Sequence, residues 1–344
     1  MNVKALSLLF FPLALSAQSI EGTGYSLPKN GLRYSIMVEK TQYTPGRFCQ
    51  YAGRYMKEKV AQEPTTTYRI IGIEADETAM PDTSKQFTLT VDKKHSIDKV
   101  TCSPSGQLLA INADAAPALS PKNIFSPAPK PKPLNPNDYM TEDILSAGST
   151  AKMAELSAKE IYDIRDSRNS LSRGEADNLP KDGAQLKLMY ENMNRQEQAL
   201  TSLFLGTTSK DTTLTSIDFY PSKEGTTTLF RFSKYYGLVD KDDLSGEPYE
   251  VNVTDLRTVT KPVLTEEQKK EDKTDIGLYV SKPDKIKLEV TKDGNTIKTT
   301  EIEAAQFGYV QSLSGELFGK KQTSEIVLDP LTGSVKSIKS VDLK

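Results

Sequence analysis

The chain has 344 residues with 44 basic and 46 acidic side chains, which gives a formal net charge of −2. At this length we expect two or three domains. The even spread of charge excludes the basic surface typical of nucleic-acid-binding proteins. Neither a G-x-G-x-x-G nor a Walker pattern occurs, so the phosphate-binding loops with those signatures are excluded as well.

The N-terminus has the layout of a secretory signal peptide. Lys4 is followed by an apolar run of eleven residues, 5–15, and by the small residues Ser16 and Ala17. A membrane span needs about twenty apolar residues, so this run is too short to be an anchor. We therefore expect export with removal of residues 1–17, and no transmembrane segment in the rest of the chain.

Residues 23–114 are expected to form a small α+β domain. Apolar and polar residues alternate over 31–40, which indicates a half-buried strand. Apolar residues recur at spacings of three and four within 44–60, which indicates a short helix. Further strands are expected at 66–74, 86–91 and 107–111.

A proline-rich segment, 115–140, follows this domain, with seven prolines between residues 117 and 136. Proline fixes φ and lacks a backbone donor, so we expect an extended spacer of polyproline II type between two bodies. The apolar pair Ile124 and Phe125 could dock onto one of them. Recognition by a P-x-x-P reader is disfavoured, because such readers are chiefly intracellular modules.

Residues 145–344 change first to a helical pattern. Apolar stripes over 150–172 and 183–205 predict two amphipathic helices, and the short polar connection predicts an antiparallel hairpin. Ser149 or Thr150 can cap the first helix, and Asp182 can cap the second.

The remainder of the chain is strand-like. Strands are expected at 213–220, 226–232, 248–256, 276–280, 285–291, 296–302, 307–313, 324–329 and 334–338. Three of the junctions, PSKEG, KDGN and PLTG, carry turn chemistry. The expected fold class is α+β, mainly β: a small N-terminal domain, a proline-rich linker, and a helical hairpin packed on an antiparallel β-sandwich.

Four segments carry a resemblance to a known family. They are YTPGRFCQYAGRYM (43–56), QALTSLFLGTT (198–208), AAQFGYVQSL (304–313) and DPLTGSV (329–335). The chain resembles an uncharacterised family of exported Bacteroidetes proteins of about this length. The resemblance implies a location in the periplasm or at the cell surface of a Gram-negative bacterium. The family is a domain of unknown function, so it transfers no catalytic residue.

The two cysteines, Cys49 and Cys102, would meet an oxidising environment after export. One bridge between them is possible, and two separate thiols are the alternative; the sequence leaves both open, because a disulfide needs Cα atoms within about 7 Å. His95 is the only histidine and is expected in an exposed turn, which excludes a His-rich zinc site. The acidic stretch 240–247 departs from the EF-hand pattern and is expected to be a solvated turn. We expect neither a metal nor a cofactor.

The densest aromatic cluster is FRFSKYYG, residues 230–237. Phe230 and Phe232 alternate with polar residues and are expected in the core. Tyr235 and Tyr236 are candidate binding residues that could stack on a sugar or a peptide. Separately, the triplet DTT around Thr212 resembles a short O-glycosylation motif.

No catalytic residue is assigned, and the balance favours a protein without enzymatic activity. We expect an exported cell-envelope protein that acts as a binding or structural module, with an envelope macromolecule or a glycan as partner. The alternative is a glycosidase-like hydrolase of extracellular or periplasmic polymers, which would need two carboxyls about 5 Å or 6.5–9.5 Å apart. A cavity with convergent carboxyls would favour the hydrolase, and an exposed aromatic patch would favour the binding module.

Overall fold

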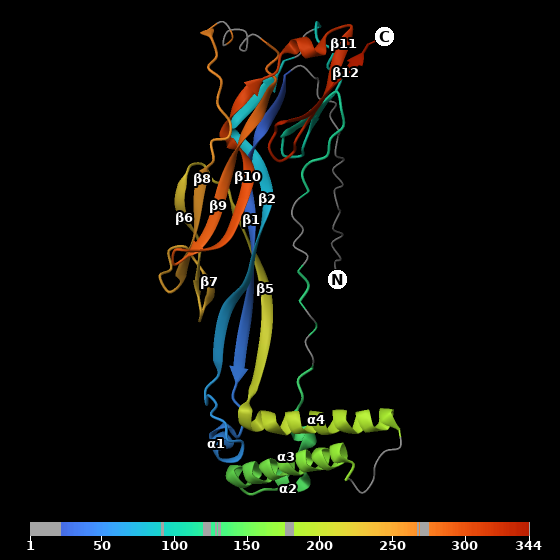
Figure 1. The fold of residues 1–344 in the computed structure, drawn as a ribbon, viewed down its shortest axis with the longest axis vertical. Helices are drawn as coiled ribbons and strands as arrows, with labels where there is room; N and C mark the ends of the chain where they lie inside the picture. The colour runs from blue at the N-terminus through green and yellow to red at the C-terminus, as the bar shows by residue number, and fades with distance from the viewer. Residues whose placement is uncertain are drawn as a thin grey trace, which may run out of the picture.

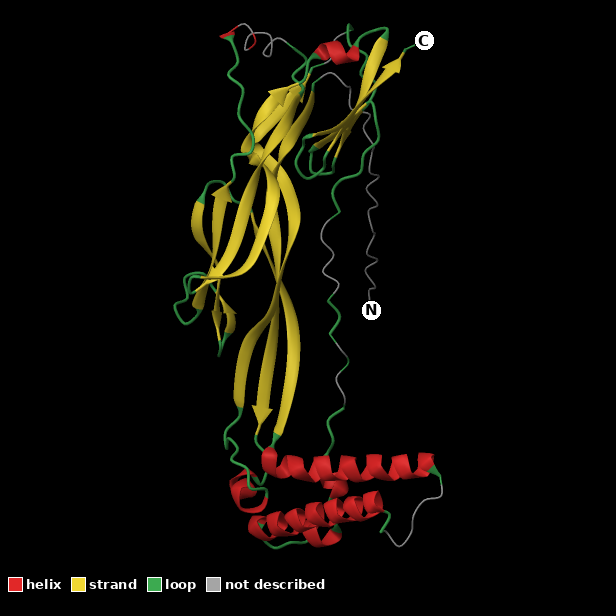
Figure 2. Cartoon of the chain, viewed as in Figure 1, coloured by secondary structure: helices red, strands yellow, loops and turns green. Residues whose placement is uncertain are grey.

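The computed structural model describes residues 22–90, 93–119, 125–127, 129, 132–175, 182–266, 268 and 275–343. The molecule is elongated, with β-sheets at one end, helices at the other and a narrow β-stem between them (Figures 1 and 2). It is mainly β, and the paired strands are antiparallel, as the sequence predicts. The expected signal peptide, 1–17, lies outside the described residues.

A three-stranded sheet forms the axis of the molecule. Its order is β2 (Thr65–Leu89), β1 (Thr23–Thr44) and β5 (Thr207–Phe219). The two strands expected at 66–74 and 86–91 are parts of the single strand β2. The pairing of β1 with β2 changes register between Ser26 and Pro28, where Pro28 lies opposite Pro81. A bulge of this kind accommodates prolines that an unbroken ladder would not.

A second sheet covers the upper part of this axis. Its order is β10 (Asn295–Ser312), β9 (Tyr279–Lys292), β8 (Glu247–Asp255), β6 (Gly225–Ser233) and β7 (Gly237–Val239). The core between the sheets is built from alternate residues of β1, such as Leu32, Tyr34 and Ile36, and from facing residues such as Val251 and Leu288. The part of the chain that forms a sandwich therefore includes β1 and β2 as well as later strands.

A four-stranded sheet completes the upper end. Its order is β12 (Val335–Asp342), β11 (Gln322–Leu328), β4 (Leu108–Ile111) and β3 (Val100–Cys102). It packs with the upper parts of β1 and β2 and with the 3-10 helix η3 (Gly315–Phe318) around a second core. The junctions KDGN and PLTG connect hairpins, β9–β10 and β11–β12. PSKEG instead carries the chain from β5 in one sheet to β6 in another.

Six of the described helices gather at the far end of the stem, away from η3, and form a third core. They are η1 (Cys49–Tyr51), α1 (Ala52–Tyr55), η2 (Pro136–Tyr139), α2 (Glu142–Leu145), α3 (Thr150–Arg173) and α4 (Gly183–Leu205). The two long helices occupy the predicted ranges, and Ser149 and Asp182 cap them through bonds to the N–H groups of Lys152 (3.2 Å) and Ala184 (3.1 Å). Their apolar stripes face each other and Phe48, so the hairpin packs with η1 and α1 rather than on the sandwich.

The proline segment joins β4 at the upper end to η2 among the helices. Strands from both sides of it share sheets, because β1 pairs with β5 and β4 pairs with β11. Strands that precede the boundary expected at 115–140 therefore lie in the same sheets as strands that follow it. The expected small domain cannot bury the apolar face of β1 alone, and β8 and β9 supply the cover. Ile124 lies outside the described residues, and Phe125 is half-buried.

We predict that cutting the chain in the proline segment leaves the molecule assembled. A site for a sequence-specific protease inserted after Lys122 would be cleaved readily, because its described neighbours such as Leu119 are exposed. The two fragments are expected to coelute in gel filtration and to separate only in denaturant, because they share two sheets. Fragments that separate under native conditions would show that the two halves fold independently.

Two buried tyrosines provide a matched test of the cores. The Tyr25 hydroxyl donates to the carbonyl of Gly277 (3.0 Å) or Tyr279 (3.2 Å) and accepts from the Tyr279 N–H (2.6 Å). The Tyr34 hydroxyl is buried and has no hydrogen-bond partner among the described residues. Tyr25→Phe is expected to lower the free energy of unfolding by about 1–3 kcal/mol, because it leaves buried backbone groups unpaired.

Tyr34→Phe is expected to be neutral or stabilising, because it removes a buried polar atom without breaking a bond. Denaturant unfolding of both variants measures the difference. Equal losses of stability in the two variants would contradict this account of the cores.

Candidate functional site

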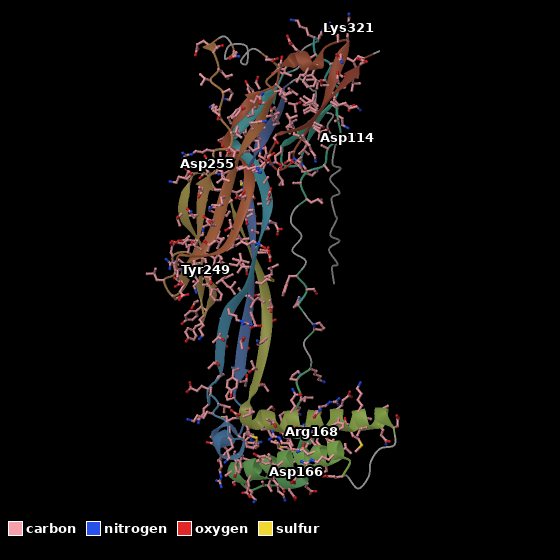
Figure 3. All side chains as sticks on the ribbon, viewed as in Figure 1. Asp114, Asp166, Arg168, Tyr249, Asp255 and Lys321 are labelled. Atoms are coloured by element: carbon pink, nitrogen blue, oxygen red, sulfur yellow. The ribbon has the colours of Figure 1, made fainter. Side chains whose placement is uncertain are left out.

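A cavity of about 520 Å³ opens where the sandwich meets the stem. β2 contributes Tyr68, Arg69 and Ile70 to its wall, and the remaining wall comes from the second sheet and its turns. Tyr249 of β8, labelled in Figure 3, lies in this wall on the flank that carries β6 and β7. The site thus combines residues from distant parts of the chain.

The turn between β6 and β7 is fixed against β2. The backbone N–H of Tyr68 donates to the carbonyl of Lys234 (2.7 Å), and the Tyr235 N–H donates to Ser233 Oγ (3.3 Å). Gly237 has φ +77°, and a Cβ there would lie 3.3 Å from the Tyr68 ring. The turn therefore needs glycine for its backbone conformation and for close contact with β2. Tyr235 and Tyr236, which precede this glycine, point outward from the turn.

The aromatic residues of the cluster divide as the sequence predicts. Phe230 and Phe232 are buried, and Phe230 stacks on Tyr249 with ring centroids 4.6 Å apart. Tyr235 is 64% exposed and Tyr236 is 71% exposed. These two rings form the most exposed aromatic pair on the described surface, and Tyr235 belongs to the cavity wall.

The charges at the cavity are mainly positive. Lys234 lies over the Tyr235 ring, 5.9 Å from its centroid. Lys292 pairs with Glu247 (2.6 Å), and this hydrogen bond raises the pKa of Lys292. Arg69 pairs with Glu39 on β1 (2.7 Å). Two of the three cations in the wall are thus paired with carboxylates, and Lys234 remains beside the Tyr235 ring as the cation that could attract an anionic ligand with an apolar face.

A second cavity, of about 420 Å³, collects carboxylates. Glu77 of β2, Glu303 of β10 and Asp329 after β11 lie in its wall together with Lys285. Partial burial of its carboxyl raises the pKa of Glu77, and the charges of Asp329 and Glu303 raise it further. This is the arrangement that would favour a hydrolase.

Two features weaken a catalytic interpretation of this second cavity. Asp329 Oδ1 accepts from the N–H groups of Leu331 (2.9 Å) and Thr332 (3.0 Å), so it shapes the turn between β11 and β12. Glu77 and Glu303 are both exposed, so the cavity excludes little water. Within the described residues, no group of three or more His, Cys, Asp or Glu side chains is placed to hold a metal ion.

The other predicted site residues are dispersed. Cys49 and Cys102 are free thiols at opposite ends of the molecule, one in η1 and the other in β3, so of the two possibilities the structure has the separate thiols. Burial raises the pKa of Cys102. His95 is half-buried beside η3 rather than exposed, since a Cβ at Gly315 would lie 2.7 Å from its Nε2. Thr212 is half-buried on β5, opposite Glu39.

Most of the cavity at the stem could not be predicted from the sequence. Tyr235 was found because aromatic residues cluster locally around it, whereas Tyr68 and Lys292 lie on other strands, without a local signal. Glu77 and Asp329 were missed for the same reason. Only the pairing of β2 with β1 and the packing of the sheets bring these residues together.

Residues 21–336 match a family described as a domain of unknown function, DUF4831. The chain belongs to this family. No curated protein and no solved structure matches it. Among the described helices of this DUF4831 protein, none has both the length and the apolar character needed to span a bilayer.

The four segments that carry the resemblance to a family meet in pairs within the DUF4831 fold. Segments 43–56 and 198–208 join the stem to the helices. There the N–H of Phe48 donates to the carbonyl of Leu203 (2.6 Å), and a Cβ at Gly46 would lie 2.3 Å from that carbonyl. Segments 304–313 and 329–335 meet at Asn30 on β1, whose side chain accepts from the Ala305 N–H (2.8 Å) and donates to the carbonyl of Leu331 (2.9 Å). All four segments therefore contribute to the framework, and none lines the cavity at the stem.

Glu77 supplies a test of the carboxylate cavity. A carboxyl whose pKa is raised on folding binds its proton more tightly in the native state, so stability falls as pH rises from the unfolded pKa, about 4.3, to the folded one. Glu77→Gln should therefore be more stable than the wild type at pH 7 and lose this advantage near pH 4. Solvent screening at an exposed residue limits the gain to about 0.5 kcal/mol.

Thermal unfolding of both proteins at the two pH values measures this effect. Glu301→Gln is the matched control, because Glu301 lines the same cavity and is exposed. A larger pH-dependent gain in the control than in Glu77→Gln would contradict the assignment.

Proposed function

We propose that this protein is an exported cell-envelope component of a Gram-negative bacterium that binds an acidic glycan without chemical conversion. The observation that carries the proposal is the cavity at the stem, where exposed tyrosines stand beside cations. The signal-peptide pattern and the resemblance to exported Bacteroidetes proteins support the location.

The chemistry of the wall fits such a ligand. The faces of Tyr68 and Tyr235 can cover the C–H faces of sugar rings, and Lys234 and Arg69 can donate to carboxylate or sulfate groups. A cavity of this size accepts a short stretch of polymer, and the exposed pair Tyr235 and Tyr236 would extend the contact beyond it.

We predict that the full chain binds polygalacturonate and chondroitin sulfate but not neutral dextran. The double variant Tyr235→Ala and Tyr236→Ala should weaken binding about tenfold or more, because it removes two stacking platforms and corresponds to roughly 1.4 kcal/mol. Affinity electrophoresis measures the retardation by each polymer.

Tyr162→Ala is the matched control, because Tyr162 is an exposed tyrosine of α3 among the helices, away from the cavity. Its affinity should equal that of the wild type, provided both variants keep their thermal unfolding transitions. Equal binding of dextran, or no effect of the double variant, would count against the proposal.

The alternative function, a glycosidase-like hydrolase, rests on the raised pKa of Glu77 beside Glu303. In that case Glu77 would be the proton donor and Glu303 the second carboxylate. Incubation of the same polymers with the wild type and with Glu77→Gln distinguishes the two functions. New reducing ends that appear with the wild type and are lost in Glu77→Gln would favour the hydrolase over the binding module.

A further inference from the structure

The outer edge of β5 is a long strand edge without a neighbouring strand among the described residues. β5 pairs with β1 from Thr207 to Phe219 without a change of register, and it is the last strand of its sheet. Thr213, Thr215 and Asp218 are exposed. Among the described residues, no strand pairs with the other side of β5.

This edge lacks the devices that usually block strand addition. Edge strands are commonly protected by charged residues, especially Lys, by proline or by bulges. β12 has Lys336 and Lys339 along its edge, and β2 has Pro81 and two register shifts. Residues 212–217 of β5, with the sequence TTLTSI, contain neither a charge nor a proline and are rich in β-branched side chains.

The sequence of β5 is complementary to itself in one antiparallel register. With Leu214 opposite Leu214, Thr213 lies opposite Thr215, and Lys210 lies opposite Asp218. A shift by one position brings Asp211 opposite Asp218 and loses the opposite charges. Opposite-charge and Thr–Thr cross-strand pairs stabilise antiparallel sheets, and like charges oppose them. Lys210 and Asp218 already pair with Glu39 and Arg33 on β1, so the register centred on Leu214 would continue these rows of alternating charge across the edge, and charge complementarity selects it.

We propose that β5 is a dimerisation edge whose occupant is β5 of a second copy of this chain. The paired strands would form a continuous six-stranded sheet, with the helices of the two copies pointing in opposite directions. β5 forms the flank of the stem opposite β6 and β7, so the second sheet does not cover its edge (Figure 1). This surface lies apart from the cavity at the stem, and the inference does not depend on glycan binding.

The described residues of the proline segment lie on the same side of the molecule in Figure 1. Its described residues are mostly exposed, with Leu119 at 89%, and the alternate residues of β5 remain accessible beside it. A partner strand would enter between β5 and this segment, which is joined at its two ends to β4 and η2.

A cysteine at position 214 tests the register. Residues directly opposite in an antiparallel pair have Cα atoms about 4.5–5.5 Å apart, within the range of a disulfide. Mild oxidation of Leu214→Cys should give about fivefold more covalent dimer than Thr208→Cys, because two copies of position 208 would be about 40 Å apart along the strands. The wild type, with Cys49 and Cys102, gives the background.

Sedimentation of the wild-type chain supplies a measurement that does not depend on the variants. A dimer at micromolar concentration, together with selective cross-linking of Leu214→Cys, supports the proposal. A monomer at all concentrations, equal cross-linking of the two cysteine variants, or a Leu214→Cys adduct in intact cells with a different polypeptide would overturn it.

Discussion

Buried hydrogen bonds of Asn30, on β1, to Gln306 of β10 and to the turn between β11 and β12 tie the three sheets into one body. The Asn30 N–H donates to Gln306 Oε1 (2.9 Å), and Gln306 Nε2 donates to the Asn30 carbonyl (2.7 Å). The Asn30 side chain donates to the carbonyl of Leu331 (2.9 Å) and accepts from the Ala305 N–H (2.8 Å). Asn30 is 2% exposed, and each of these polar groups would be costly without its partner.

This network explains the irregular course of β10. The pairing with β9 is interrupted between Ala304 and Tyr309, and the interruption lets Gln306 reach back to β1. A Cβ at Gly308 would lie 1.8 Å from the carbonyl of Lys282, so only glycine permits the close approach of the strands there. Gly333 has φ +67°, and a Cβ there would lie 2.6 Å from the Pro28 ring at the start of the same junction. Segments 304–313 and 329–335 thus have geometric roles in joining the sheets.

The parts of the fold that depend on local chemistry could be predicted from the sequence. α3 and α4 were placed to within a residue, because a polar cap, a 3.6-residue period and a glycine stop all act within one segment. The hairpins around Gly294 and Gly333 were predicted for the same reason. The long strand β2 was divided in two, since its sequence contains Pro81 and a bulge follows it, where residues 82–85 of β2 lie opposite the single residue Leu27 of β1.

The parts that depend on distant pairing could not be predicted. β1 alternates clearly, but nothing in its sequence says that β5, more than 160 residues later, lies beside it. The boundary at 115–140 was therefore placed where composition changes, although the sheets continue across it. The cavity at the stem could be predicted only in part, for the same reason. The aromatic cluster around Tyr235 is local in the sequence, whereas the opposite wall of the cavity comes from β2 through the packing of the sheets. The cysteine count and the expected oxidising environment allowed a bridge between Cys49 and Cys102. The distance between the two residues depends on the length of β1, which the sequence does not show.

The length of β1 also explains why the proline segment has its composition. Ser26 bridges Gln107 next to β4, and β1 then runs to Thr44 beside the helices, about 60 Å at roughly 3.3 Å per residue. The 24 residues 112–135 must return over this distance, which requires an average rise of about 2.5 Å per residue. A helix rises only about 1.5 Å per residue and would fall short, while polyproline II at about 3.1 Å per residue can span the distance.

The lower stem needs stabilisation of its own, since none of residues 39–44 is buried. The ion pairs of Glu39 with Arg69 (2.7 Å) and Lys210 (3.3 Å) tie its three strands together. Strand length, cross-strand charges and an extended return segment together set the separation between the sandwich and the helices.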